Sequence, residues 1–380
     1  MTVSGAFFRR NGVVFFDSVP MTYYNRNREA RPNWKGDIHM EKKNIDWANL
    51  GFAYQPTDKR YVSVYKDGKW DDGMLTSDPN VTMNESAGVL QYAQTCFEGL
   101  KAYTTEDGRI VCFRPDLNAE RMSNTCRRLM MPVFPKERFL EAVEQVVRAN
   151  AAYVPPYGSG ATLYIRPYMY GSGPVIGVAP APEYTFRLFC TPVGPYFKGG
   201  AKPIRLCVSD YDRAAPHGTG HIKAGLNYAM SLFPGYEAHD RGFAENLYLD
   251  AATRTKVEET GGANFIFVTK DGKVVTPKSP SILPSITRRS LMTVARDILG
   301  LECEEREVYF SELKDFAECG LCGTAAVISP VGLIDDHGTE IRFPSGMEKM
   351  GPVIQKLYDT LTGIQMGRIE GPKGWVYPIL

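Results

Sequence analysis

Residues 221–228 read His221-Ile222-Lys223-Ala224-Gly225-Leu226-Asn227-Tyr228, which places one lysine among small and apolar residues at an expected helix start. A lysine amine becomes a good nucleophile when desolvation or a neighbouring cation lowers its pKa. A lone lysine is more often a solvated surface residue. The rest of the chain therefore has to decide whether Lys223 carries chemistry.

Two further segments supply polar groups in apolar surroundings. Glu259 begins Glu-Thr-Gly-Gly-Ala-Asn and precedes an expected strand, Phe265 to Val268, so its carboxylate should lie beside a buried sheet. Residues 283–288, Leu-Pro-Ser-Ile-Thr-Arg, lead into an amphipathic helix. Unpaired N–H groups and the positive dipole end make such a helix start a phosphate site. Alone, the Glu259 segment is more often a solvated loop, and the Leu283 segment is more often a plain capped helix.

The pattern of turns and helices predicts an α+β fold. Asp-Gly pairs at 67–68, 107–108 and 271–272 lie between strand-like runs, which indicates tight hairpins and antiparallel sheet. Apolar residues recur at helical spacing in three places. These are Leu140, Val143, Val147 and Ala151; Leu291, Val294, Ala295 and Ile298, before a capping Gly300; and Ile354, Leu357, Tyr358 and Leu361.

The chain is long enough for two domains. A Gly- and Pro-rich stretch at 194–203 separates the expected strands Tyr184 to Thr191 and Ile204 to Ser209, so it is the predicted linker. We expect an irregular arm at 1–45, a small domain at 46–193 and a large domain at 204–380, with a cleft between the domains.

Composition excludes several classes of partner. The 44 Lys and Arg against 43 Asp and Glu give a net charge of +1 in 380 residues, so no global field attracts nucleic acid or lipid. The apolar runs are too short to span a bilayer, and the N-terminus has no unbroken signal-peptide core, so a cytoplasmic location is expected. Eight cysteines are too few for a disulfide scaffold, and the C-x-x-C pair Cys319 and Cys322 has no second pair to complete a metal site.

Taken together, the motifs resemble the fold-type IV, or class IV, aminotransferases, and most closely the branched-chain enzymes. The resemblance runs from about Leu50 to Leu380, in the order and near the spacing of the family. Beside the three segments above, it rests on Tyr92-x-x-x-x-Phe97-Glu98-Gly99-Leu100-Lys101-Ala102-Tyr103, Phe113-Arg114-Pro115-x-Leu117-Asn118-x-x-Arg121-Met122, Tyr164-Ile165-Arg166-Pro167 and Gly323-Thr324-Ala325. One such motif would be weak, but so many in order are specific.

The resemblance implies pyridoxal 5′-phosphate as the cofactor. Lys223 would hold it in an imine bond and, once freed by substrate, would move the proton, as anchor and general base. Tyr228 would bind the phenolic oxygen of the cofactor, and Glu259 the ring nitrogen. The remaining cofactor residues are Arg121, Ile286, Thr287 and Thr324 for the phosphate and Leu283 for the ring.

The same resemblance implies a homodimer with shared active sites that moves the amino group of leucine, isoleucine or valine reversibly to 2-oxoglutarate. The predicted substrate residues fall into four groups. They are the aromatic wall Phe97, Tyr164 and Tyr196; the loop residues Ile176 and Val178, lent by the neighbouring subunit; Arg166 and Tyr92 for the γ-carboxylate of glutamate; and the backbone of Thr324 and Ala325 for the α-carboxylate. No role is assigned to Leu50 or Phe52.

The sequence departs from the family pattern at a few positions, and two alternative functions stay open. Cys322 stands where relatives often have a small hydroxyl residue, and Ala326 and Ser329 occupy the positions of the redox cysteines of mammalian relatives. Cys319 and Cys322 are a candidate for another redox pair. The rivals are another fold-type IV enzyme, such as a D-amino-acid aminotransferase or a lyase, and a cofactor-binding protein without catalysis.

Overall fold

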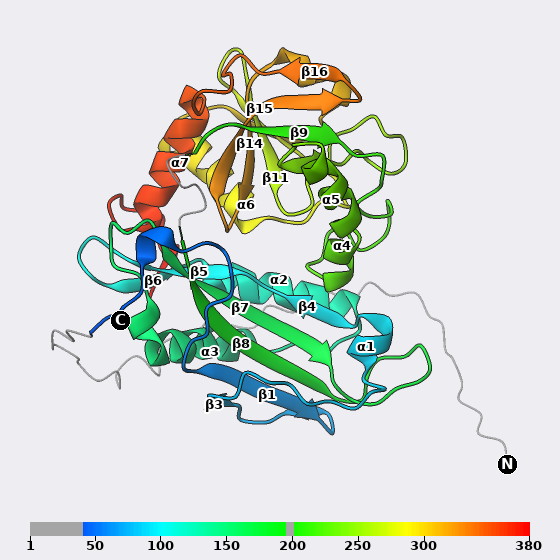
Figure 1. Cartoon of the computed structure of the whole chain (residues 1–380), viewed down its shortest axis with the longest axis vertical. Coiled ribbons are helices and arrows are strands. Elements are labelled where there is room, and N and C mark those ends of the chain that lie inside the picture. Colours follow the sequence, from blue (N-terminus) through cyan, green and yellow to red (C-terminus); the bar gives the residue numbers. More distant parts are fainter. Residues whose placement is uncertain (1–40, 195–200) are drawn as a thin grey trace, which may run out of the picture. The chain divides into compact units, whose positions relative to one another are not determined.

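A computed structural model describes residues 41–194 and 201–380. Residues 41–380 form one structural unit, whose elements are labelled in Figure 1. Most of the predicted arm at 1–45 and of the predicted linker at 194–203 lies outside the described residues.

All three Asp-Gly pairs form hairpin turns, as predicted. They join β1 (Arg60–Lys66) to β2 (Lys69–Trp70), β5 (Leu100–Thr104) to β6 (Ile110–Phe113), and β11 (Asn264–Thr269) to β12 (Val274–Pro277). In the first turn both Asp67 (φ 51°) and Gly68 (φ 80°) have positive φ. Tight hairpins need this backbone geometry because it matches the twist of the strands.

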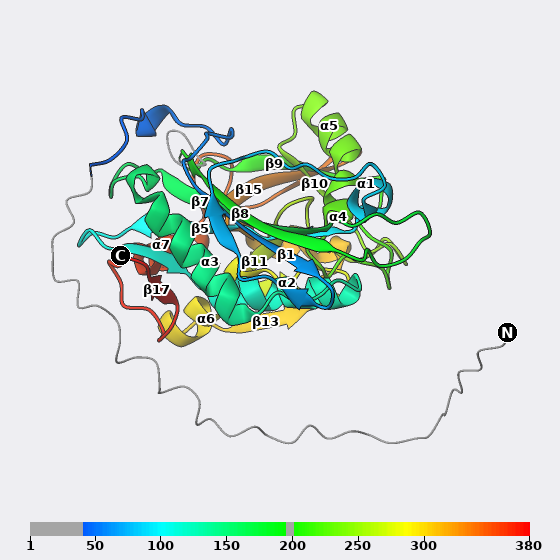
Figure 2. The ribbon, with the colours of Figure 1, turned by 90° about the horizontal axis from the view of Figure 1, so that it is seen from below.

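The first sheet is antiparallel and has the strand order β17-β6-β5-β7-β8-β1-β2, with β3 on β1 and β4 on β7. Its other strands are β3 (Met74–Thr76), β4 (Thr95–Phe97), β7 (Thr162–Gly171), β8 (Tyr184–Val193) and β17 (Val376–Pro378). Its helices are α1 (Gly88–Tyr92), α2 (Pro115–Arg128) and α3 (Lys136–Ala149), with the short 3-10 turns η1 (Trp47–Asn49) and η2 (Ala151–Tyr153). Helices α2 and α3 pack on one another and on this sheet (Figure 2).

The second sheet is mixed and has the order β10-β9-β15-β14-β11-β12-β13, with β16 on β15. Its other strands are β9 (Ile204–Val208), β10 (Glu245–Leu247), β13 (Cys303–Arg306), β14 (Phe316–Gly323), β15 (Val327–Asp336) and β16 (Thr339–Arg342). The helices in this part are α4 (Gly225–Ala229), α5 (Leu232–Asp240), α6 (Ile286–Thr293), the π-helical turn η3 (Val294–Ile298), the 3-10 turn η4 (Phe310–Asp315) and α7 (Pro352–Gln365). Parallel pairs join β9 to β10 and β15, and β12 to β13. Two sheets with separate helices confirm the predicted α+β class.

The three predicted helices are confirmed as α3, as α6 continued by η3, and as α7. Gly300 has φ 66° directly after η3, in the left-handed conformation of a helix C-cap. One core cluster joins Tyr103 and Val111 of the first sheet to Ile328 of the second and to Leu357 on α7. Strand β17 pairs with β6, so the end of the chain returns to the first sheet.

The hypothesis that Cys319 and Cys322 form a redox pair does not fit the structure. Both residues lie on β14, three positions apart, so their side chains point to opposite faces of the sheet. They belong to different core clusters. Burial raises the pKa of Cys322 to about 12 and that of Cys319 well above its ordinary value, so both thiols stay protonated.

Among the helices of the described residues, none combines the length and the apolar character that a membrane span requires.

Candidate active site

A central cavity of about 410 Å³ brings together residues that are far apart in the sequence. This volume lies within the range of small-molecule sites. Eleven predicted site residues line it: Phe97, Arg121, Tyr164, Arg166, Lys223, Tyr228, Glu259, Leu283, Ile286, Thr324 and Ala325. Both sheets and the loops that precede α4 and α6 contribute to this lining.

Lys223 lies just before α4, and its backbone is fixed from two sides. Its N–H donates to Thr125 Oγ1 (3.0 Å), and its carbonyl accepts from the N–H of Phe97 (3.2 Å). The amine Nζ donates to Tyr228 Oη (2.6 Å) and lies 4.7 Å from the centre of the Phe97 ring. Burial, and then the charge of Arg121, lower the pKa of Lys223 to about 7. A large share of this amine is therefore neutral and nucleophilic at neutral pH.

Glu259 is a buried carboxylate with a fixed orientation. Its Oε1 accepts from the N–H of Leu283 (2.7 Å) and lies 2.6 Å from Nη2 of Arg213, and its Oε2 accepts from Asn264 Nδ2 (2.5 Å). Burial raises the pKa of Glu259 to about 7, and the Arg213 guanidinium opposes this shift. Burial and Glu259 raise the pKa of Tyr228 above its usual value, so this phenol stays neutral.

Arg121 extends from α2 into the cavity and is held by a buried acid. Its Nε and Nη2 donate to the two carboxylate oxygens of Glu98 (2.8 and 2.7 Å), and its Nη1 donates to the carbonyl of Pro284 (3.1 Å). Asn118 also donates to Glu98 (2.8 Å). A bidentate pair fixes the plane of the guanidinium, so Arg121 has one defined position beside the start of α6.

Backbone donors complete this end of the cavity. At the N-cap of α6, Ser285 Oγ accepts from the N–H of Arg288 (3.2 Å), which leaves the N–H groups of Ile286 and Thr287 without a partner inside the helix. Thr287 is buried in the first turn, next to Ile286. The turn between β14 and β15 brings Thr324 to the same cavity. Such donors suit an anion.

Aromatic rings line the other end. The Arg166 guanidinium lies over the rings of Phe97 (4.9 Å) and Tyr164 (5.2 Å) and donates to Tyr164 Oη (2.9 Å). Its buried Nε has no hydrogen-bond partner among the described residues. Phe52, which received no role from the sequence, packs edge-on against Tyr164 (5.3 Å) and lines the cavity.

Three predicted substrate residues lie elsewhere. Tyr92 ends α1, and its hydroxyl donates to the carbonyl of Ile176 in the loop between β7 and β8. Ile176 and Val178 are 80% and 89% exposed. None of the three lines the central cavity of its own chain, so Tyr92 is separated from Arg166 within one chain. Tyr196 lies outside the described residues.

Sequence reasoning gave no role to Glu98, Lys101 and Arg213. Glu98 and Lys101 stand inside a quoted motif, so their acid and amine were the available signal. Arg213 had none, because it lies in a loop 46 positions before its partner Glu259, and only the fold brings the two charges together.

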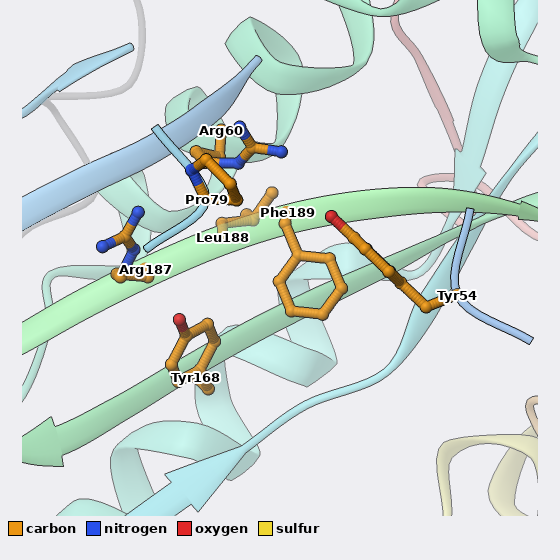
Figure 3. A pocket seen from close by; sticks show the side chains of 7 residues that line it. All are labelled: Tyr54, Arg60, Pro79, Tyr168, Arg187, Leu188 and Phe189. Carbon is orange, nitrogen blue, oxygen red and sulfur yellow. The ribbon is translucent and has the colours of Figure 1, made fainter. Parts of the chain in front are cut away.

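A second, outer cavity of about 210 Å³ is lined by Tyr54, Arg60, Pro79, Tyr168, Arg187, Leu188 and Phe189 (Figure 3). The two guanidiniums reach toward the segment that contains Pro79. Arg187 donates to the carbonyls of Asp78 (2.8 Å) and Asn80 (2.9 Å), and Arg60 donates to those of Thr57 (3.1 Å) and Ser77. These arginines hold the backbone of the chain itself.

Known proteins match the chain along most of its length. The family of class IV amino-transferases matches residues 95–334. The branched-chain-amino-acid aminotransferase of Haemophilus influenzae is 53% identical over 89% of this chain and 99% of its own, and that of Helicobacter pylori is 47% identical over 89% and 98%.

Solved structures agree with these matches. The Escherichia coli branched-chain amino acid aminotransferase has a TM-score of 0.72 and 27% identity, covering 85% of this chain and 100% of its own. The enzyme of Thermobaculum terrenum, solved in its PLP-form, has a TM-score of 0.72 and 27% identity over 86% and 100%. With this fold, this cavity and these relatives, the chain belongs to the class IV aminotransferases and, within them, to the branched-chain aminotransferases.

Proposed function

We propose that the protein transfers the amino group of L-leucine, L-isoleucine or L-valine reversibly to 2-oxoglutarate, giving the branched 2-oxo acid and L-glutamate. The observation that carries this proposal is Lys223, whose half-buried amine lies 2.6 Å from Tyr228 Oη in a cavity with an acid at one side and anion donors at the other. The match to branched-chain aminotransferases over 89% of the chain supports the substrate class.

The cavity fits pyridoxal 5′-phosphate by its donor chemistry. Among its described lining residues, Arg121, Arg166 and Arg213 are cationic, Lys223 is partly protonated, and Glu259 is the one carboxylate. Excess positive charge and free N–H groups suit a phosphate and a substrate carboxylate. When bound, this cofactor supplies a ring that accepts electrons while an amino group moves between carbon skeletons.

We assign cofactor roles to the predicted residues. Arg121, the N–H groups of Ile286 and Thr287, and Thr324 would hold the phosphate. Leu283 would pack on the ring, Glu259 would face the ring nitrogen, and Tyr228 would bind the phenolic oxygen. The N–H of Leu283 and the amide of Asn264 support the role of Glu259, because they leave its carboxylate only small freedom to turn.

Lys223 would anchor the cofactor and carry the proton of the reaction. Its low pKa supports both roles, because a neutral amine can attack a carbonyl group and can then accept a proton. The bonds to Thr125 and Phe97 fix the backbone of Lys223, while its side chain would stay free to swing.

The substrate would lie among Phe97, Tyr164 and Arg166, joined by Phe52. The aromatic rings suit a branched aliphatic side chain. The unpaired Nε of Arg166 supports this arginine as the charge partner of the γ-carboxylate of glutamate. The α-carboxylate would bind the backbone at Thr324 and Ala325. A solved complex of a similar branched-chain amino acid aminotransferase with 4-methylvaleric acid supports a site for a branched carboxylate.

We further propose a homodimer in which the loop with Ile176 and Val178, together with Tyr92, completes the cavity of the neighbouring subunit. Their exposure and the hydrogen bond that joins Tyr92 to Ile176 support a preformed unit for a second copy. We keep residues 46–193 and 204–380 as the two domains; the change of sheet between β8 and β9 supports this division, although β17 at the end of the second range pairs into the first sheet. The eight unpaired cysteines support the reducing cytoplasm as the location.

The experiment is a transamination assay with each of L-leucine, L-isoleucine, L-valine and D-leucine, with 2-oxoglutarate as acceptor and glutamate as the measured product. We expect turnover of the three L-amino acids, none of D-leucine, and none with Lys223→Ala that remains folded by circular dichroism. Turnover of D-leucine alone would replace the proposal by a D-amino-acid aminotransferase.

A further inference from the structure

Lys101 is a second buried amine close to the central cavity. It lies on β5 opposite Tyr164 of β7 and is 7% exposed. Its Nζ donates to the carbonyl of Ala325 (2.6 Å), in the turn between β14 and β15. The first sheet thus holds the turn of the second sheet through a contact between residues 224 positions apart.

The charge of Lys101 has no acidic partner in the part of the chain that the structure describes. Among the described residues, no carboxylate lies within 4 Å of its amine, and burial alone lowers the pKa of Lys101 to about 8. It is therefore still protonated at neutral pH. A buried cation is costly unless an anion or several oxygens compensate it, and one carbonyl does so only in part.

The turn that Lys101 holds faces the central cavity on its other side. Thr324 and Ala325 line the cavity, whereas Lys101 does not. Thr324 Oγ1 also donates weakly to the carbonyl of Gly99 (3.4 Å). The carbonyl of Ala325 shares a peptide group with the N–H of Ala326, so the cation polarises that N–H directly. It acts on the backbone of Thr324 and Ala325, which faces the cavity, by holding the turn in place.

We infer that Lys101 is a positioning residue for carboxylate recognition: it fixes and polarises the turn at Thr324 and Ala325, which binds the α-carboxylate common to every substrate. The inference rests on the proposed function for the identity of the carboxylate. The cavity would then recognise two carboxylates separately. The turn held by Lys101 would bind the α-carboxylate of every substrate, and Arg166 would bind only the γ-carboxylate of glutamate.

The test compares Lys101→Met with Lys101→Arg. Met keeps the length and apolar stem without charge, and Arg keeps the charge and the donors. The probe is 4-methylvalerate, which has a carboxylate but no amino group, titrated into the cofactor-loaded protein by calorimetry at pH 7. We expect Lys101→Met to raise its Kd about tenfold, equivalent to about 1.4 kcal/mol, and Lys101→Arg to stay within about threefold of the parent. The KM values for leucine and glutamate should rise by similar factors in Lys101→Met, and kcat should change less.

A pH series separates charge from shape. The titratable and charged groups that line the cavity are Arg121, Tyr164, Arg166, Arg213, Lys223, Tyr228 and Glu259, and Glu98 lies behind them as the partner of Arg121. The Lys101→Met variant retains all of them, so the difference between parent and variant reports Lys101. We expect the advantage of the parent in Kd to disappear as the pH rises through about 8, where Lys101 loses its proton.

Two results would overturn the inference: an unchanged Kd in Lys101→Met, or a fall in both Tm and affinity that Lys101→Arg does not restore, which is the signature of a structural residue. Failure of the proposed function looks different. In that case the parent would not transaminate leucine, whatever the Kd values of the variants.

Discussion

The two cavities of this protein both contain buried arginines, but the partners of these arginines differ. In the outer cavity, Arg60 and Arg187 each donate to two backbone carbonyls of segment 57–80. Their hydrogen bonds are directed at the chain itself, and they attach residues 77–80 to β1 and β8. Their arrangement is complete without a ligand.

In the central cavity the arginines are arranged to bind an anionic ligand, because the described residues do not satisfy all of their donors. Arg121 and Arg213 are oriented by Glu98 and Glu259, and Arg166 leaves its buried Nε without a partner among the described residues. Lys223 adds an amine whose pKa burial has brought to about 7. The comparison teaches that burial of an arginine does not mark a site. What marks it is a donor held in place and left unsatisfied, next to groups whose pKa lies near neutrality.

Among the substitutions that compare the two cavities, Glu259→Gln is expected to have the largest effect on the rate. The amide keeps the size of the side chain but cannot hold a proton on the ring nitrogen. We expect the half-reaction with leucine to slow on the order of a hundredfold or more, as when one preorganised electrostatic group is removed from a site, while the cofactor remains bound. Stopped-flow absorbance per bound cofactor measures it.

Glu258→Gln is the matched control, because Glu258 is also buried but is bonded to Ser279 and Ser281 and does not line the central cavity. Loss of cofactor from Glu259→Gln with an unchanged rate per loaded site would restrict Glu259 to cofactor binding.

A selective effect is expected for Arg166→Gln. Leucine has no side-chain charge to pair, whereas the γ-carboxylate of glutamate among aromatic rings needs a cation. We expect the KM for glutamate to rise at least about tenfold and that for leucine to change by less than about threefold. The two half-reactions, followed separately by absorbance, decide it; equal weakening of both would make Arg166 structural.

The smallest effect on catalysis is expected in the outer cavity. Arg187→Met should leave kcat/KM for leucine and glutamate within about twofold of the parent. It should lower the free energy of unfolding by about 1–2 kcal/mol, because the carbonyls of Asp78 and Asn80 lose charged donors. Chemical denaturation measures this loss. A large fall in kcat/KM for Arg187→Met would contradict the assignment of a purely structural role to the outer cavity.

Local chemistry explains which features could be predicted from the sequence. The Asp-Gly turns, the helix ended by Gly300 and the strand after Glu259 depend on neighbouring residues, and all are confirmed. The pairing of Lys223 with Tyr228 is implied by the family resemblance and not by local chemistry, and the structure places Lys223 Nζ 2.6 Å from Tyr228 Oη.

Pairings between distant segments could not be read in this way. No local signal brings β17 to β6, makes β9 parallel to β15, or sets Arg213 against Glu259. The contact of Lys101 with Ala325 joins two sheets, so a lysine inside a motif gave no sign of its partner. The C-x-x-C spacing misled for the opposite reason, since on a strand it separates the two thiols.

The most direct test of the account is to trap the bond between the protein and its cofactor. The cofactor-loaded protein is reduced with borohydride, digested and mapped by mass spectrometry. Lys223 lines the cavity, and Lys101 lies behind its wall; burial lowers the pKa of both amines, so Lys101 is the alternative that the experiment has to exclude. The account predicts that the cofactor mass lies on the peptide that contains Lys223 and is lost in Lys223→Ala. A label on the Lys101 peptide, or one that persists in Lys223→Ala, would contradict it.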